Sequence, residues 1–368
     1  MTALDDLAAA GVSIWLDDLG RHRLVSGDLA RLIAEQHVVG VTTNPSIFAA
    51  AVGDGTYYAE QITELTKNGS DVDEVVQAVV VEDVQSACDL FADTHRATAG
   101  VDGRVSLEVD PRLASNTDAT VAEARQLWDR VNRPNLMIKI PGTRPGLPAI
   151  TATLAAGISV NVTLIFGLPR YAEVTDAWLL GLEQAHENGH DLSAIGSVAS
   201  FFISRFDSAV DRRLDALTEP AAKKLRGRAA IANARLAYAH FEEVLASDRW
   251  QRLAALGAHP QRPLWASTST KDPAYEDTRY VVELVAPNTV NTMPPKTLQA
   301  MLDHGELKGR TIGDDPPAER ALLDALARLG IGYDVVVDQL EREGVASFEK
   351  SWQQFRDSVE QAMERAQA

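Results

Sequence analysis

Short apolar runs recur along the chain and are separated by longer stretches with a helical pattern. Several of these runs are rich in Val and Ile, as buried strands are. Strands that alternate with helices predict right-handed βαβ units and a parallel sheet. The predicted strands are Ser13–Leu19, Val38–Thr43, Arg104–Val109, Leu136–Ile140, Ser159–Ile165, Ser197–Ile203, Pro263–Thr268 and Thr289–Thr292. About eight such units in one chain favour a closed (β/α)8 TIM barrel of the α/β class over a doubly wound open sheet.

Three dipeptides mark points where a predicted strand gives way to a helix: Asn44-Pro45, Asp110-Pro111 and Asp272-Pro273. Asn and Asp are good helix N-caps, and proline suits the first helical position. The sequence therefore predicts that helices begin at these positions, directly after the strands. Short βα turns of this kind line the carboxyl-end mouth of a barrel, where active sites lie.

The segments between and after the strands predict additional helices. Residues 45–103 have room for two, around Gly55–Lys67 and Asp71–Ala99, and residues 205–262 for two or three, including Ile231–Leu245. Residues 296–368 are expected to form a helical tail that ends in an amphipathic stretch near Ser347–Arg365. Because no Gly/Ser linker or repeat interrupts the chain, we expect a single barrel domain over residues 1–368, with its strands within about 13–292.

The charge balance restricts the possible partners. The chain has 35 basic and 52 acidic residues, a formal charge of −17. Such a surface repels nucleic acid and anionic membranes, so an anionic substrate has to be met by a local cluster of cations. The acidic amino-terminal segment is unlike a secretory signal, and no apolar run approaches the roughly 20 residues that cross a bilayer. We expect a soluble cytoplasmic protein, either a monomer or a homodimer.

Sulfur and histidine chemistry are not indicated. The one cysteine, Cys88, cannot form an intrachain disulfide and has the apolar, helically spaced neighbours of a buried structural thiol. The chain contains no Walker A, dinucleotide-binding or HExxH motif, and its eight histidines lack metal-ligand spacing. We therefore expect neither a metal nor an organic cofactor.

Polar residues occur inside or at the end of predicted strands that should be apolar. These positions are Asp17, Glu108, Lys139, Asn161, Thr163 and Ser204. Residues i and i+2 of a strand share a face, so Asn161 and Thr163 point the same way. If the outer face of the sheet packs on helices, both side chains face the barrel interior. Lys139, between Ile138 and Ile140, is expected to face inward too.

A buried lysine suggests covalent chemistry. Burial disfavours the ammonium form, and a neutral amine attacks a ketone to form an imine. The protonated imine is an electron sink when the neighbouring C–C bond breaks. Asp17 and Glu108 supply two carboxylates for the proton transfers of such a reaction, and Thr163 is suited to position a water. The residues expected to hydrogen-bond substrate hydroxyls are Asn44, Asn161 and Ser204.

A hydroxyl-rich loop at the end of a predicted strand is the candidate phosphate site. Residues 265–273 include Ser267 and Lys271 and lead into a predicted helix. Helix amino termini and loops of this kind bind anions. Arg205, next to Ser204, is expected to add a second cation.

Each of these positions also has a purely structural interpretation. Lys139 is consistent with a buried ion pair with Glu108 or Asp17, and Asp17 is consistent with a turn residue. Asn44 is explained as the N-cap before Pro45, and the loop at 265–273 as an ordinary capping loop. The other polar strand residues are consistent with hydrogen bonds that hold the barrel. The signal for a site is therefore their joint appearance near the ends of separate strands.

Four segments in combination resemble the transaldolase family. They are Val41–Phe48, Ser106–Asp110, Ile138–Pro141 and Ile158–Phe166, and they follow the order of the family. The third of them resembles the strand that carries the Schiff-base lysine. The resemblance runs from about Ser13 to Thr292, and the chain length and long insertions are similar to those of actinobacterial-type transaldolases.

This resemblance implies an enzyme of the Schiff-base-forming aldolase group, acting in the non-oxidative pentose phosphate pathway. It implies transfer of dihydroxyacetone from sedoheptulose 7-phosphate to glyceraldehyde 3-phosphate, which gives erythrose 4-phosphate and fructose 6-phosphate. Lys139 would be the nucleophile and Asp17 the acid/base at the C–C bond. Glu108 would act through a water held with Thr163. The residues that would contact the dihydroxyacetone unit are Asn44, Asn161 and Ser204.

The chain departs from shorter members of this family at the phosphate site. Those members carry one arginine where this chain has Ala209 and another in the loop that corresponds to Ser267–Lys271. We expect Lys271 and Arg205 to replace them. Two other functions remain as alternatives. One is a Schiff-base aldolase, similar to fructose-6-phosphate aldolase, that releases dihydroxyacetone, and the other is a sugar-phosphate-binding barrel without turnover.

Overall fold

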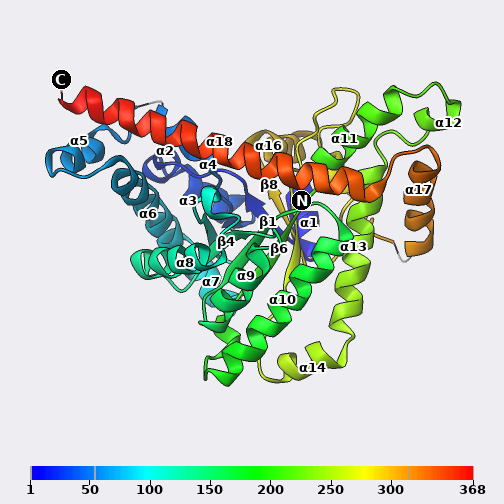
Figure 1. The fold of residues 1–368 in the computed structure, drawn as a ribbon, viewed down its shortest axis with the longest axis horizontal. Coiled ribbons are helices and arrows are strands. Elements are labelled where there is room, and N and C mark those ends of the chain that lie inside the picture. Colours follow the sequence, from blue (N-terminus) through cyan, green and yellow to red (C-terminus); the bar gives the residue numbers. More distant parts are fainter. Residues whose placement is uncertain (1, 54, 314, 368) are drawn as a thin grey trace.

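The computed structural model describes residues 2–53, 55–313 and 315–367. Within these residues the centre is a closed barrel of eight parallel strands that follow one another in chain order (Figure 1). The strands are β1 (Val12–Leu16), β2 (Val38–Val41), β3 (Arg104–Glu108), β4 (Leu136–Pro141), β5 (Val160–Ile165), β6 (Ser197–Phe202), β7 (Arg262–Ala266) and β8 (Thr289–Met293). The predicted (β/α)8 barrel is confirmed, and no predicted strand end lies more than three residues from the observed one.

Helices surround this barrel and cover the outer face of its strands (Figure 1). In the described part of the chain they are α1 (Ala3–Ala9), α2 (Arg21–Val25), α3 (Asp28–Glu35), α4 (Pro45–Gly53), α5 (Ala59–Lys67), α6 (Val72–Leu90), α7 (Ala92–Ala97), the 3-10 turn η1 (Pro111–Leu113), α8 (Thr117–Val131), α9 (Gly146–Ala155), α10 (Leu168–Glu187), the 3-10 turn η2 (Leu192–Ala194), α11 (Ser204–Asp215), α12 (Pro220–Lys223), α13 (Ala229–Leu245), α14 (Asp248–Ala255), α15 (Arg279–Val282), α16 (Pro295–His304), α17 (Pro316–Arg328) and α18 (Tyr333–Gln367). The segments 45–103 and 205–262 thus contain more helices than the sequence predicted.

The prediction of a helix at Asp272-Pro273 was wrong, whereas at Asp110-Pro111 a short 3-10 helix begins at Pro111 with Asp110 as its N-cap. Asp110 is followed by the short turn η1, and Asp272 by an irregular turn. The Asp110 carboxylate binds both the backbone N–H and the guanidinium of Arg112, and the Asp272 carboxylate pairs with Arg226 at 2.8 Å. Each carboxylate thus also caps a backbone N–H group, that of Arg112 or that of Ala274, but neither turn continues as an α-helix. At Asn44-Pro45 the prediction is confirmed, because α4 begins at Pro45.

The structure also shows where the residues that were expected to be buried lie. Cys88 is a buried thiol on α6, as predicted. Strand residues are buried along almost the whole length of every strand, because one face fills the barrel and the other packs on helices. Among the described residues, no helix combines the length and apolar character that a bilayer crossing needs.

The helical tail is dominated by α18, a helix of 35 residues. It begins well before the predicted amphipathic stretch and runs across the carboxyl end of the barrel (Figure 1). It packs against α4, α5 and α6 and also touches β5. Residues far from the barrel in sequence thereby reach its mouth.

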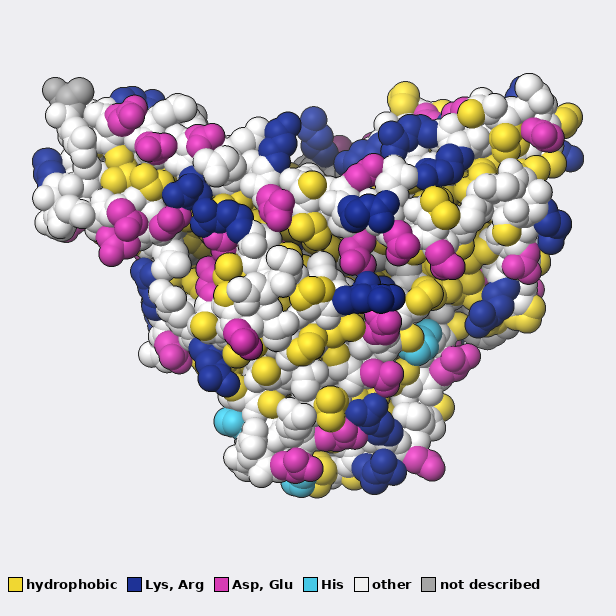
Figure 2. Space-filling model, viewed as in Figure 1, with side chains coloured by type: hydrophobic (Ala, Val, Ile, Leu, Met, Phe, Trp, Pro, Cys, Tyr) yellow, Lys and Arg dark blue, Asp and Glu magenta, His cyan; other side chains and the backbone are white. Residues whose placement is uncertain are grey.

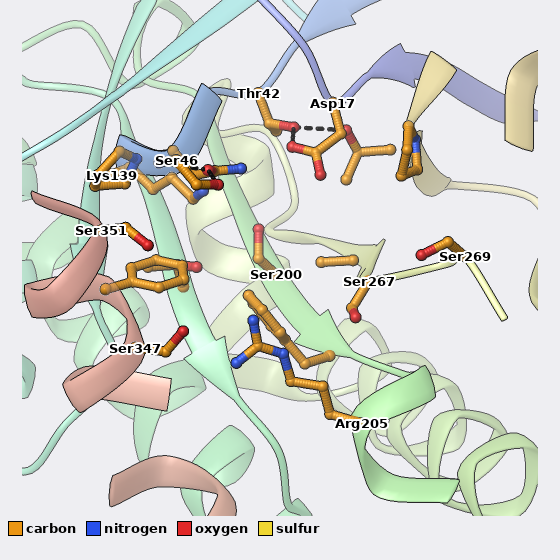
Figure 3. A pocket seen from close by; sticks show the side chains of 18 of the residues that line it. Asp17, Thr42, Ser46, Lys139, Ser200, Arg205, Ser267, Ser269, Ser347 and Ser351 are labelled. Atoms are coloured by element: carbon orange, nitrogen blue, oxygen red, sulfur yellow. Dashed lines mark hydrogen bonds between the residues drawn. The ribbon is translucent and has the colours of Figure 1, made fainter. Parts of the chain in front are cut away.

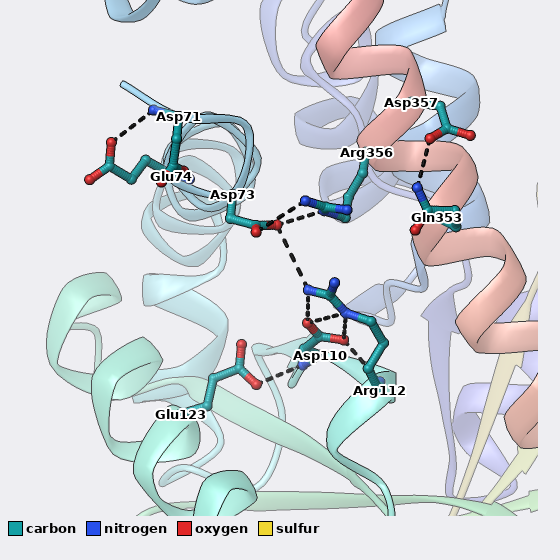
Figure 4. A network of polar contacts seen from close by, with 9 residues as sticks. All are labelled: Asp71, Asp73, Glu74, Asp110, Arg112, Glu123, Gln353, Arg356 and Asp357. Carbon is teal, nitrogen blue, oxygen red and sulfur yellow. Dashed lines mark hydrogen bonds and ion pairs between the residues drawn. The ribbon is translucent and has the colours of Figure 1, made fainter. Parts of the chain in front are cut away.

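A chain of polar contacts connects α18 to the turn after β3 (Figure 4). Arg356 Nε lies 2.7 Å from Asp73 Oδ1 on α6, and the Arg112 guanidinium reaches the same carboxylate at 3.8 Å. Arg112 also pairs with Asp110, whose backbone N–H donates to Glu123 Oε2 at 2.8 Å. Burial raises the pKa of Glu123 to about 7, because the Asp110 N–H offsets only part of the cost of desolvation.

Replacing Glu123 by glutamine is expected to stabilise the protein selectively at higher pH. Glu123→Gln keeps an oxygen for the Asp110 N–H but removes the buried charge. In the wild type the folded carboxyl has a pKa of about 7 against an ordinary 4.5, so the unfolded chain loses its proton first and stability falls as pH rises through this window. Urea unfolding should give the variant an advantage of about 1–3 kcal/mol at pH 8 and much less at pH 5. An equal difference at both pH values would contradict the raised pKa.

Candidate active site

The carboxyl ends of the barrel strands open into a cavity of about 250 Å³ (Figure 3). Its walls are mainly polar and come from the strand ends, the loops that follow them, and α18. They include Asp17, Thr42, Asn44, Lys139, Thr163, Ser200, Phe202, Arg205, Ser267, Ser269, Lys271, Thr292, Ser347, Phe348 and Ser351. Most of the site residues predicted from the sequence are therefore brought together at this end of the barrel.

Lys139 reaches the cavity from the interior of β4. The register of the sheet aligns it with Glu108 on β3 and Asn161 on β5, so neighbouring strands bring a carboxylate next to the amine. The side chain is buried, with Nζ 2.7 Å from Glu108 Oε1 and donating to the carbonyl oxygen of Thr43 at 2.8 Å. The ion pair left open by the sequence analysis is present. It coexists with access to the cavity, because Lys139 also lines its wall.

Glu108 is a buried carboxyl with an altered proton affinity. Burial raises its pKa, and the neighbouring Lys139 offsets part of that rise. Its Oε2 atom has no hydrogen-bond partner among the described residues. A carboxyl with a raised pKa is a better base when ionised, so Glu108 is suited to take the proton that Lys139 must lose before it can attack a carbonyl.

Asp17 provides a second acid and lines the cavity (Figure 3), whereas Glu108 contacts Lys139 but is not among the residues that line the cavity. It follows β1 directly, and its backbone N–H donates to the carbonyl oxygen of Met293, which continues the ladder between β1 and β8. Its Oδ1 accepts from Thr42 Oγ1 at 2.7 Å, and Thr42 Oγ1 lies 2.6 Å from Thr292 Oγ1. Burial raises the pKa of Asp17, against the opposing effects of Lys139 and Thr42. The site thus holds two carboxyls of raised pKa on different strands.

Thr163 and Asn161 face the barrel interior but differ in what they contact. Thr163 lines the cavity, and its buried Oγ1 has no hydrogen-bond partner within the described residues. Asn161 is fully buried, donates to Ser106 Oγ at 2.9 Å and accepts from Ser200 Oγ at 2.7 Å. Asn161 therefore does not line the cavity itself. It lies one layer of side chains below the cavity, where it holds Ser200, which does line it. The Oγ1 atom of Thr163 is therefore a buried polar atom that is available to a water or a substrate hydroxyl.

Asn44 and Ser204 have clear structural partners. Asn44 Oδ1 accepts the backbone N–H groups of Ser46 and Ile47 at the start of α4, which confirms the N-cap interpretation, although Asn44 also lines the cavity. Ser204 is buried at the start of α11, with Oγ 2.9 Å from Ser267 Oγ. Ser267 lines the cavity in a left-handed conformation with φ of 57°. Ser204 thus braces the loop that carries Ser267.

Two cations, Arg205 and Lys271, line the cavity without an acidic partner. In the described part of the chain neither has a carboxylate oxygen within 4.0 Å. The Arg205 guanidinium lies 5.6 Å from the centre of the Phe202 ring, and Lys271 Nζ donates to Ser269 Oγ at 2.7 Å. Burial lowers the pKa of both groups, and Arg205 lowers that of Lys271 further. Cations that repel each other in this way favour an anion such as phosphate between them.

Arg205 is separated from Lys139 and Asp17, whereas the charge of Lys271 acts on Asp17 and offsets a part of the rise in its pKa. In the close-up, Lys139, Thr42 and Asp17 lie along one side of the cavity and Arg205 rises from the opposite side (Figure 3). The space-filling view shows Lys and Arg side chains gathered around the hollow at this end of the molecule (Figure 2). For a protein with a formal charge of −17, this local excess of positive charge is the cluster that an anionic substrate requires.

Several cavity residues were missed by the sequence analysis. Ser200 is a polar residue within β6, so the pattern that identified Asn161 would have found it. Thr42 stands two residues before Asn44 in a segment that had already been singled out. No sequence signal connects the cavity residues of α18 with the barrel, because only tertiary packing brings that helix across the mouth.

Comparison with known proteins adds independent information. The family model described as Transaldolase/Fructose-6-phosphate aldolase matches residues 14–359. A transaldolase of Renibacterium salmoninarum is 58% identical over 365 residues, which cover 99% of this chain and 98% of that protein. A transaldolase of Mycolicibacterium smegmatis is 57% identical over 360 residues, covering 98% and 97% of the two chains. The family match begins in β1 and ends in α18, so it includes the tail as well as the barrel.

Inorganic phosphate is expected to bind between Arg205 and Lys271 and to raise the midpoint of thermal unfolding, because a ligand that binds only the folded state stabilises it. Arg205→Met removes one cation and keeps an apolar stem over Phe202. We expect it to weaken phosphate binding about tenfold or more. The affinity is obtained from the midpoint as a function of phosphate concentration at constant ionic strength.

The control is Arg328→Met, which removes an exposed arginine of α17 that does not line the cavity. This variant should respond to phosphate as the wild type does. Equal phosphate responses of the two variants would contradict the assignment.

Proposed function

Since the chain belongs to the transaldolase/fructose-6-phosphate aldolase family, we propose that it transfers a dihydroxyacetone unit from sedoheptulose 7-phosphate to glyceraldehyde 3-phosphate. The products are erythrose 4-phosphate and fructose 6-phosphate, in the non-oxidative pentose phosphate pathway. One observation carries the mechanism: the buried amine of Lys139 faces a cavity, with Glu108 2.7 Å from it and Asp17 on another wall.

The first step joins Lys139 to the substrate. Glu108 takes a proton from Lys139, and the neutral amine attacks the ketone carbon C2. The resulting alcohol leaves as water when it receives a proton from Glu108, through a water held by Thr163. Support for this role of Thr163 comes from its buried hydroxyl, which lacks a hydrogen-bond partner among the described residues. The product of this step is a protonated imine on Nζ.

The second step breaks the bond between C3 and C4. Asp17 takes the proton of the C4 hydroxyl, the aldehyde leaves, and the electron pair of the broken bond moves into the imine to give an enamine. The raised pKa of Asp17 makes it a stronger base, and the hydrogen bond from Thr42 fixes its orientation.

The third step reverses the second with a new aldehyde. The enamine carbon attacks the aldehyde carbon of glyceraldehyde 3-phosphate, and Asp17 returns its proton to the aldehyde oxygen. Water then hydrolyses the imine and frees Lys139. Arg205 and Lys271 hold the phosphate group at the far side of the cavity, and Asn44, Ser267 and the hydroxyl network around Asn161 and Ser204 contact or position the sugar hydroxyls.

One alternative has an observation in its favour. The ion pair of Lys139 with Glu108 is also what a sugar-phosphate-binding barrel without turnover would contain. Breaking a buried ion pair costs several kcal/mol, so a purely structural role for it is physically reasonable. Chemical trapping of the imine separates the two functions.

Borohydride is expected to trap the sugar on Lys139. In the presence of fructose 6-phosphate, reduction should inactivate the wild type and leave a three-carbon adduct on the peptide that contains Lys139, detected by mass spectrometry. Lys139→Ala should abolish both transfer and adduct while keeping the fold. Lys308→Ala removes an exposed lysine and is the matched control. Binding without any adduct in the wild type would favour the non-catalytic barrel.

Substitutions of the two acids should affect different steps of the reaction, and borohydride trapping distinguishes these steps. We expect Asp17→Asn and Glu108→Gln each to lose ~10²–10⁴ in transfer rate, the usual scale for general acid–base groups. Asp17→Asn still forms the imine but does not cleave C3–C4, so its adduct should be the intact hexose phosphate. Glu108→Gln should form the adduct slowly. Identical three-carbon adducts at wild-type rate in both variants would exclude these roles.

A further inference from the structure

One wall of the cavity faces Lys139 and is formed by α18 instead of by the barrel strands. Three residues of this helix line the cavity: Ser347, Phe348 and Ser351. The centre of the Phe348 ring lies 5.8 Å from Lys139 Nζ, and its side chain is 9% exposed. The ring of Phe348 also lies 6.4 Å from the ring of Phe202, which lines the cavity from β6. The amine therefore faces an aromatic ring, which has no proton to give, and the hydroxyls of Ser347 and Ser351 lie on the same wall.

The amino-terminal half of α18 is held close to the barrel. The Tyr333 hydroxyl donates to Asn233 Oδ1 at 2.6 Å and accepts the backbone N–H of Leu168 at 2.8 Å. One turn before Phe348, a Cβ atom on Gly344 would lie 3.1 Å from Leu164 Cδ2, a contact with little room to spare. Glycine at this position lets the helix backbone approach the end of β5 closely.

The carboxyl-terminal half of α18 is held as firmly. The Phe355 ring packs on Phe48 of α4 with centres 5.8 Å apart, and Phe355 is fully buried. Arg356 pairs with Asp73, which leads through Arg112 to the turn directly after Glu108 (Figure 4). Phe348 lies between these two anchored halves of one helix, so its ring is fixed over the amine.

The enamine on Lys139 has two possible fates. In transfer, its carbon forms a bond to the acceptor aldehyde and Asp17 protonates the aldehyde oxygen. In release, the same carbon takes a proton from water, and the imine that results is hydrolysed by a second water to free dihydroxyacetone and Lys139. The two paths differ only in whether a water or the aldehyde reaches the carbon first. Excluding water from this point therefore favours transfer.

We propose that Phe348 of α18 is the specificity-determining residue that shields the enamine from water and so directs the reaction to transfer. This inference rests on the proposed function and deepens it. Phe348 takes no proton and binds no phosphate; it covers the amine with a ring that is anchored at both ends of its helix. The carboxyl-terminal helix thus completes the active site of the barrel.

The test compares two fluxes in each variant: release of free dihydroxyacetone from fructose 6-phosphate alone, and transfer from fructose 6-phosphate to erythrose 4-phosphate. Phe348→Ala opens the wall, and Phe348→Leu keeps an apolar side chain and guards against unfolding of the alanine variant. Phe241→Leu is the matched control, since it removes a buried phenyl ring of α13 at a position outside the cavity lining and away from the anchors of α18. Borohydride trapping reports the imine in every sample.

The ratio of release to transfer should rise about tenfold in Phe348→Ala, less in Phe348→Leu, and stay at the wild-type value in Phe241→Leu, while trapping persists in all of them. An unchanged ratio in both Phe348 variants would overturn the inference and leave the proposed function intact. A parallel rise in Phe241→Leu would also overturn it, because a general loosening of the core rather than the loss of the ring over the amine would then be responsible. Absence of a trapped imine in the wild type would instead remove the proposed function, and this inference with it.

Discussion

The pairing of Lys139 with Glu108 in the barrel interior is the interaction from which the rest of the site follows. Neither charge can be buried alone at an acceptable cost, so the two must lie side by side, and the register of β3 and β4 provides this. A slip of one residue in either strand would turn one of the two side chains outward. In the proposed mechanism, the same pair holds the proton that Lys139 loses before it attacks the ketone.

Different regions of the cavity carry different charge, and each is suited to a different part of the substrate. Burial raises the pKa of Glu108, beside Lys139, and of Asp17. Arg205 lies across the cavity from Lys139 and Asp17, and Lys271 is the second cation of the cavity wall. This arrangement orients a molecule that has a ketone near one end and a phosphate at the other. Helix α18 then covers the reactive end, so water is excluded where the enamine forms.

The sequence predicts the barrel well because strand positions follow from local apolar runs, and polar residues such as Lys139 and Glu108 stand out inside them. It predicts less well what tertiary contacts decide. Asp272 caps the backbone N–H of Ala274, but only a turn follows it, and Asn161 lies below the cavity because Ser106 and Ser200 bind its amide. No sequence pattern identified Phe348, because its place next to Lys139 depends on how a helix more than 200 residues away in the sequence packs on the barrel.

The central claim is that a covalent bond forms between Lys139 and the ketone carbon. If an imine forms, the ketone oxygen must leave as water, and the oxygen of the product must come from solvent. The direct measurement uses fructose 6-phosphate labelled with oxygen-18 at C2 and erythrose 4-phosphate, with mass spectrometry of the sedoheptulose 7-phosphate at early times. The label that unreacted fructose 6-phosphate loses during incubation with Lys139→Ala gives the background of spontaneous exchange. The account predicts that the product loses the label with each transfer. A product that has lost no more label than spontaneous exchange removes would contradict it.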